Sequence, residues 1–113
     1  MEELRSCDVI LCTCICSASR RVVAALNVEQ IVMDECGMCT EPTCLVPLVS
    51  YPSARQVALI GDHQQLQPIV VNYVAKHFGL GKSLFERYAS QAVMLTKQYR
   101  MLSVISLLFA TIM

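Results

Sequence analysis

Four short apolar runs, each passing into polar or charged residues, constrain the fold of this chain most strongly. They are D-V-I-L-C-T-C (8–14), E-Q-I-V-M-D-E (29–35), R-Q-V-A-L-I-G-D (55–62) and A-V-M-L-T-K-Q-Y (92–99). Runs of this length, rich in Val, Ile and Leu, predict buried strands. Because helical stretches separate the runs, the sequence predicts an α/β fold with a mostly parallel sheet.

The clearest helical stretch between these runs is residues 40–49. Thr40 is a candidate N-cap, and Pro42 falls in the first turn, where its missing N–H does no harm. Pro47 is a poor interior residue, so we expect a short or kinked helix. The other helical stretches are residues 20–27 and residues 72–89, the second broken near Gly79 and Gly81.

Composition and charge narrow the possible classes of protein. The chain has 113 residues, enough for one small domain, and 55% of them are hydrophobic whereas 16% are charged, which suits a buried sheet. Nine basic residues balance nine acidic ones, so only a local electrostatic footprint for nucleic acid is possible. A polar start and the absence of a long apolar run predict neither a secretory signal nor a membrane span. We therefore expect an intracellular protein, cytoplasmic or nuclear.

Six of the seven cysteines form two groups that resemble metal ligands only superficially. In a strand, alternating residues share one face, and this applies to the first group, Cys12, Cys14 and Cys16. The second group is Cys36, Cys39 and Cys44, and Cys36-x-x-Cys39 has ligand-like spacing. No second Cys-x-x-Cys pair follows. We therefore interpret these cysteines as small buried hydrophobic residues and predict no structural zinc in this segment.

Two of the predicted strands end in acidic residues. Asp34 and Glu35 follow the second apolar run, and Gly61 and Asp62 end the third. Ligands of open α/β sheets bind beyond the carboxyl ends of the strands. One carboxylate there can hold the hydration shell of Mg²⁺, and a second can accept a proton from an attacking water. Taken alone, two acids after a strand are equally consistent with a solvated turn.

The ordered set V-x-D-E, G-D-x-x-Q-L-x-P and Q-Y-R-M resembles the superfamily 1 helicases, more narrowly the up-frameshift, nonsense-mediated-decay type of RNA/DNA helicase. T-E-P (40–42) and S-L-F-E-R (83–87) fit the same branch, and the resemblance covers residues 6–101. It implies a partial RecA-like motor domain that is incomplete at its N-terminal side. Residues 1–101 would be the C-terminal part of the first RecA-like domain, and residues 102–113 a divergent apolar tail.

The resemblance implies roles in ATP hydrolysis for five residues. Asp34 and Glu35 match the Walker B pair, so Asp34 would hold Mg²⁺ through water and Glu35 would be the catalytic base. Gln65 matches a glutamine that senses the γ-phosphate, and Asp62 belongs to the same coupling motif. Arg100 matches an arginine that reaches the γ-phosphate. ATP and Mg²⁺ are the implied cofactors of the complete protein.

The resemblance also implies partners. Thr13 and Ser17 match a segment that lies along the backbone of single-stranded RNA or DNA, and a second RecA-like domain would complete the ATP site. Each assignment has a plain structural alternative. Gln65 could cap a turn, Arg100 could pair with Asp62, and Thr13 could be an ordinary strand residue. His63 is interpreted as a structural loop residue.

One segment resembles a phosphate-binding loop but matches only the end of its sequence pattern. G-L-G-K-S (79–83) has the ending of G-x-x-x-x-G-K-[ST], but Lys76 occupies the position of the first glycine. We expect Lys82 on a surface turn that opens the next helix. Since no phosphate loop occurs in the 113 residues, the chain alone is predicted to be inactive. The alternative is a non-catalytic short isoform that acts as a protein-interaction module.

Overall fold

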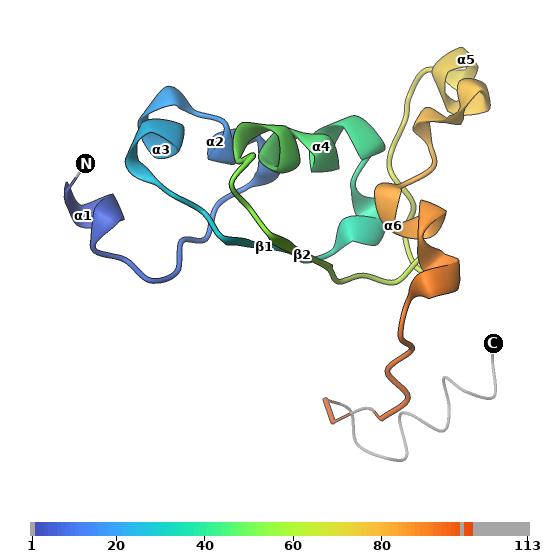
Figure 1. Cartoon of the computed structure of the whole chain (residues 1–113). Helices are drawn as coiled ribbons and strands as arrows, with labels where there is room; N and C mark the ends of the chain where they lie inside the picture. The colour runs from blue at the N-terminus through green and yellow to red at the C-terminus, as the bar shows by residue number, and fades with distance from the viewer. Residues whose placement is uncertain (1, 98, 101–113) are drawn as a thin grey trace.

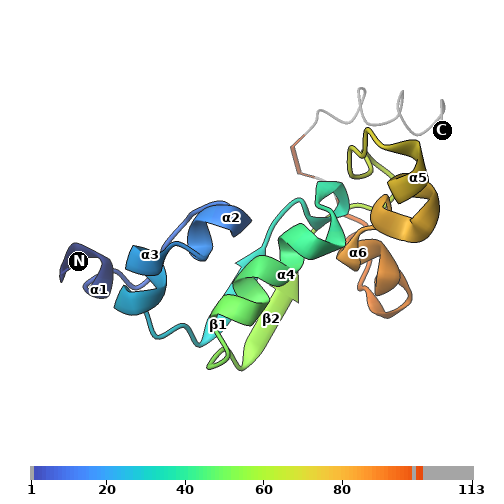
Figure 2. The ribbon, with the colours of Figure 1, turned by 90° about the horizontal axis from the view of Figure 1, so that it is seen from above.

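The computed structural model describes residues 2–97, 99 and 100, and its centre is a pair of parallel strands. Strand β1 (Gln30–Met33) pairs with β2 (Gln56–Leu59), in register from Gln30 opposite Gln56 to Met33 opposite Leu59. Helix α4 (Glu41–Ser50) connects the two strands and lies along the sheet (Figure 2). The predictions of strands within 29–35 and 55–62, and of parallel pairing, are confirmed.

Helix α4 begins where the sequence predicts and ends later than its proline suggests. Thr40 is the N-cap residue and Pro42 lies in the first turn. The helix passes through Pro47, which is buried, and continues to Ser50, whose hydroxyl donates to the carbonyl of Val46 at 2.8 Å. Pro47 therefore does not end the helix.

The first apolar run, residues 8–14, is not a strand, so this prediction is wrong. Residues 8–13 have no regular structure, and Cys14 begins helix α2 (Cys14–Ser17). The physical reason is local capping: Thr13 Oγ1 accepts the backbone N–H of Cys16 at 3.2 Å. A groove of about 650 Å³ lies between this segment and β1. Helix α1 (Glu2–Arg5) precedes residues 8–13 in the sequence, and α3 (Arg20–Ala25) follows α2 and confirms the brief helix predicted at 20–27.

The region after β2 is helical in short pieces, as predicted. Its elements are α5 (Tyr73–Ala75), the wide turn η2 (Lys76–Leu80), α6 (Leu84–Arg87) and η3 (Ala89–Gln91). Gly79 interrupts η2 with a φ of 98°, a left-handed conformation that glycine adopts without steric cost. Lys82 is exposed on the turn before α6, as expected.

The last apolar run is also not a strand. Residues 92–97 and 99 have no regular structure and are exposed, while residue 98 lies outside the described part. A strand is stabilised by hydrogen bonds to a neighbouring strand, and the sheet in the described part contains β1 and β2 alone. In Figure 1 the chain after η3 leads away from both strands. The predicted tail, residues 102–113, lies outside the described residues.

A small core joins the sheet to the helices on one face. The buried apolar side chains are Ile31, Met33, Cys36, Cys44, Tyr51 and Leu84. They come from β1, the turn after it, α4, the residue that follows α4, and α6. The described residues thus form part of an α/β domain, in which α6 lies beside the turn that follows β1 (Figure 1). No helix in this part of the chain is long and apolar enough to cross a membrane.

Candidate functional site

The turns that follow β1 and β2 are joined by backbone hydrogen bonds. The N–H of Ile60 donates to the carbonyl of Met33 at 2.8 Å, and the N–H of Cys36 donates to the carbonyl of Ile60 at 2.9 Å. Asp34 and Glu35 therefore lie on the turn next to the one that leads to Asp62. The structure thus places the two acidic strand ends, predicted from sequence, at one edge of the sheet.

Two glycines allow this close approach. A Cβ atom added to Gly37 would lie 2.5 Å from the carbonyl oxygen of Asp62, and one added to Gly61 would lie 2.9 Å from the backbone nitrogen of Gly37. Gly37 belongs to η1 (Cys36–Met38), the single turn after Glu35. Gly37 is not among the site residues predicted from the sequence. Its only sequence signal is that it is a glycine two residues after the acidic pair.

Glu35 adopts an unusual backbone conformation at the edge of the sheet. Its φ and ψ are 54° and 34°, a left-handed conformation that costs a non-glycine residue about 1–3 kcal/mol. Asp34 Oδ1 accepts the N–H of Glu35 at 2.9 Å. Both side chains are exposed. The turn therefore presents two adjacent carboxylates to a ligand.

Asp62 and Gln65 form a hydrogen-bonded pair in the second turn. Asp62 Oδ1 accepts the N–H of Gln64 at 2.9 Å, and its Oδ2 accepts Gln65 Nε2 at 2.8 Å. The N–H of Gln64, followed by the amide of Gln65, lowers the pKa of Asp62 because both donors favour the ionised carboxylate. Gln65 therefore lies against the turn in this structure, and its carbonyl oxygen is the group left to meet a ligand.

The oxygen donors at this edge suit Mg²⁺ held through water. Mg²⁺ keeps several of its waters and takes one or two protein carboxylates, and Asp34 is exposed with Oδ2 outside the turn's hydrogen bond. Within residues 2–97, 99 and 100, no three Cys, His, Asp or Glu side chains are arranged to hold a metal ion directly. The prediction that this segment binds no zinc stays a prediction.

Arg100 is exposed and lies in a bend of the chain. The described residues show no ion pair between Arg100 and Asp62, Asp34 or Glu35. The structure therefore does not bring this arginine onto the strand-end turns. Gln98, which belongs to the same sequence motif, lies outside the described part.

Thr13 and Ser17 lie at the two ends of α2 and differ in their exposure to solvent. Thr13 is exposed and caps the helix. Ser17 is buried: its hydroxyl donates to the carbonyl of Cys14 at 2.6 Å, and its own carbonyl accepts the hydroxyl of Tyr51 at 2.7 Å. Ser17 thus ties α2 to the C-terminal end of α4.

A protein-family model described as an AAA domain (AAA_11) matches residues 1–73, more than half of the chain. The chain belongs to this AAA domain family.

Proteins with similar sequences support the family that the sequence motifs indicate. The chain is 54% identical over 99 residues to the human "3'-5' exoribonuclease HELZ2", with 88% of this chain and 3% of that protein aligned. It is 42% identical to the Arabidopsis thaliana "Regulator of nonsense transcripts 1 homolog" and 41% identical to the Schizosaccharomyces pombe "ATP-dependent helicase upf1", in each case with 88% of this chain aligned. The resemblance to superfamily 1 helicases of the up-frameshift type is confirmed. The chain spans 8% and 11% of the last two proteins.

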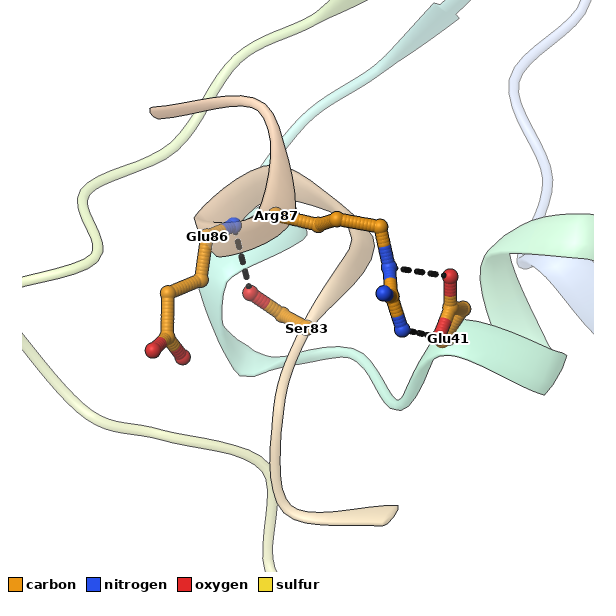
Figure 3. Close-up of polar contacts among 4 residues, drawn as sticks. All are labelled: Glu41, Ser83, Glu86 and Arg87. Carbon is orange, nitrogen blue, oxygen red and sulfur yellow. Dashed lines mark hydrogen bonds and ion pairs between the residues drawn. The ribbon is translucent and has the colours of Figure 1, made fainter. Parts of the chain in front are cut away.

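In this AAA domain segment, α6 braces both strand-end turns. Arg87 donates two hydrogen bonds to Glu41, Nε to Oε1 at 2.8 Å and Nη2 to Oε2 at 2.6 Å (Figure 3). Glu41 is the first residue of α4, shortly after the turn that carries Glu35. Arg87 lowers the pKa of Glu41 by stabilising its ionised form. The pair therefore connects α6 to the side of the site that follows β1.

The other end of α6 reaches the second turn. Ser83 is buried and caps the helix by accepting the N–H of Glu86 at 3.0 Å (Figure 3). Phe85 packs against the core, and its ring centroid lies 6.4 Å from that of His63, next to Asp62. His63 is thus half-buried beside an aromatic ring, in keeping with its interpretation as a structural loop residue.

Proposed function

We propose that this chain supplies the Mg²⁺-ATP hydrolysis residues of a helicase motor domain of RecA-like fold. The observation that carries the proposal is the contact between the two strand-end turns, which places Asp34 and Glu35 beside Asp62. Membership of the AAA domain family and the likeness to an ATP-dependent helicase support it.

The proposed roles are those that the family resemblance implies, and the exposure and hydrogen bonds of the turns are compatible with them. Bound Mg²⁺ neutralises charge on the phosphates. Asp34 holds the hydration shell of the ion, because its carboxylate is exposed and one oxygen is free of the turn. Glu35 accepts the proton of the attacking water. Gln65, which is hydrogen-bonded to Asp62, contacts the γ-phosphate. When the γ-phosphate leaves, Gln65 loses this contact, and the turn that follows β2 can change its conformation.

Two further groups complete the proposal. Arg100 stabilises the γ-phosphate once a neighbouring part of the complete protein brings it to the site, since a guanidinium suits delocalised phosphate charge. Thr13, with Ser17 anchoring its helix, lies along the backbone of a single-stranded nucleic acid, for which we favour RNA. A second RecA-like domain is the proposed partner for closing the ATP site.

The purified chain alone is proposed to be inactive, because its 113 residues contain no phosphate loop to supply a cradle of backbone N–H groups. ATP turnover should equal that of the Glu35→Gln variant. Steady turnover above that variant would contradict the proposal of inactivity.

The catalytic role is tested in a longer protein that places a phosphate loop ahead of this segment. There Glu35→Gln should lower kcat by about 10²-fold or more with little change in KM, the size of a general-base contribution. Glu29→Gln is the matched control, because Glu29 is an exposed acid at the opposite end of β1. Equal kcat values for Glu35→Gln and Glu29→Gln would overturn the role of Glu35.

A further inference from the structure

The segment between Asp62 and Glu86 differs in charge from the rest of the chain. It contains Lys76, Lys82 and two histidines and no carboxylate, although the whole chain has equal numbers of acidic and basic residues. All nine acidic residues lie outside it. Helix α5 and η2 in this segment project at the end of the molecule farthest from α1 (Figure 1). The molecule therefore has a locally cationic end that net charge conceals.

Aromatic rings are exposed at this cationic end. Tyr73 is 80% exposed and Phe78 is 84% exposed, values far from those of core residues. The rings of Tyr73 and His77 are nearly parallel, with an interplanar angle of 20° and centroids 6.5 Å apart. The ring of His77 meets that of Phe78 edge-on, with centroids 5.9 Å apart. Three contiguous aromatic rings thus face solvent.

The backbone keeps a lysine next to these rings. Gly79 turns the chain back at a φ of 98°, and the N–H of Lys82 donates to its carbonyl at 3.0 Å. A Cβ atom on Gly81 would lie 3.1 Å from Cγ of Lys76, so the aliphatic stem of Lys76 lies across this turn. Lys82 also lies close enough to lower the pKa of Glu41, so part of its charge is balanced. Lys76, which directly precedes His77, is therefore the lysine nearest to the rings in the sequence.

We propose that Tyr73, His77, Phe78 and Lys76 form a stacking surface for single-stranded nucleic acid, outside the ATP site and outside α2. Exposed rings stack on unpaired bases, and a lysine beside them contacts the phosphate of the same strand. A polyanion matches the two lysines and the absence of carboxylates between residues 63 and 85, whereas an apolar protein partner would leave Lys76 without a counter-charge. The inference takes from the proposed function only the class of partner.

The test is binding of a fluorescein-labelled oligouridine of about 12 nucleotides to the 113-residue chain, measured by anisotropy without ATP or Mg²⁺. The Tyr73→Ala/Phe78→Ala variant should bind at least tenfold more weakly, because base–aromatic stacking supplies much of the affinity. Lys76→Glu should also weaken binding and reduce the steepness of its salt dependence by about 0.7 in log–log slope for the one lost phosphate contact.

Two control variants distinguish binding at this surface from non-specific binding to other exposed apolar or charged residues. Val49→Ala removes an exposed apolar side chain from α4, and Arg21→Glu reverses an exposed charge on α3, so both should bind as the unaltered chain does. Circular dichroism of every variant confirms that the fold is kept. Because no ATP is used, loss of the ATP-site proposal would leave this result intact.

Several outcomes would overturn the inference. They are no oligouridine binding by the unaltered chain, equal binding by the ring double variant, or equal weakening by Val49→Ala and Arg21→Glu. If the ring double variant abolishes self-association in sedimentation while oligouridine binding is unchanged, the rings form a protein contact and the proposed occupant is wrong.

Discussion

Burial changes the chemistry of individual thiols in this chain. Cys44 is 0% exposed, and burial, with smaller effects of Cys39 and Cys36, raises its pKa to about 12. Cys36 is also buried, and burial raises its pKa. A thiol whose pKa is raised stays protonated and unreactive, because reactivity belongs to the thiolate. These two residues are the buried small hydrophobic side chains predicted from sequence.

Because the folded pKa of Cys44 is raised, its contribution to stability is complete below the unfolded pKa, near 9, and is lost as pH rises towards 12. Above pH 9 the free energy of unfolding should fall by at most about 1.4 kcal/mol per pH unit for this thiol, the value for one proton. Urea unfolding at pH 7, 9 and 10 measures it. Cys44→Ala should reduce the slope, whereas Cys7→Ala, at an exposed position, should not. A slope unchanged by Cys44→Ala would contradict the linkage.

Other cysteines show where residue-level prediction failed. Cys12 and Cys16 are exposed rather than buried, and Cys14 is half-buried. The alternating pattern predicted a shared face on a strand, but Thr13 starts a helix within the pattern and changes the direction of every side chain after it. The hydrogen bond from a capping side chain favours a helix start over a strand. The spacing of apolar residues gives no information about such a bond.

At the scale of elements, Gly37 decides how closely the two strand-end turns pack. Gly37→Ala should lower the free energy of unfolding by about 1–3 kcal/mol, because its methyl group would collide with the backbone of Asp62 and force the turns apart. Chemical denaturation measures the loss. Gly81→Ala is the matched control, since its methyl group would meet only the flexible stem of Lys76. Equal stability of the two variants would mean that the turns adjust without cost.

The Glu41–Arg87 pair couples two helices that are far apart in sequence. Glu41→Gln and Arg87→Met should each speed amide hydrogen exchange in α6, and the double variant should do no more than either alone, because each removes the same contact. Since the pKa of Glu41 is lowered, the coupling is present at neutral pH and is lost as pH falls through that lowered pKa. Glu86→Gln, on the same helix, is the control. Additive effects of the two substitutions would show that the pair is not coupled.

Predictability also differs between elements. The strands at 29–35 and 55–62 were predicted correctly because their apolar runs pair with each other, and α4 was predicted because Thr40 and Pro42 are local signals. The run at 92–99 also begins with apolar residues, but it has no neighbouring strand among the described residues. The acidic residues of the site were also predictable from local sequence, because they directly follow the apolar runs that form β1 and β2. The contact between Glu41 and Arg87, 46 residues apart, has no local signal.

At the scale of the whole molecule, a small core coexists with many exposed apolar side chains. Leu11, Ile69, Val71, Val93 and Leu95 are all exposed, and they come from segments before β1 and after β2 in the sequence. Exposed apolar surface of this extent favours association. The complete domain is proposed to cover part of it.

Removing residues 102–113 should raise the soluble yield of the chain, because this segment contains eight large hydrophobic residues and the described part of the chain already exposes apolar side chains that favour association. The soluble fraction after expression and the sedimentation profile measure the effect. Leu107→Ser/Leu108→Ser/Phe109→Ser keeps the length and should act in the same direction. Precipitation of the shortened chain, when the unaltered chain stays soluble, would show that the segment supports the fold.

At Glu35, the left-handed backbone sets selection for stability against selection for the proposed proton acceptor. Glycine or asparagine would adopt this conformation at lower cost than glutamate. A directed-evolution library screened for thermal tolerance alone should therefore drift towards those residues at this position and, under the proposed mechanism, lose the proton acceptor. A library screened for ATP turnover in a complete motor should retain glutamate and collect its stabilising changes elsewhere. Sequencing both selected pools would reveal the trade-off at a single codon.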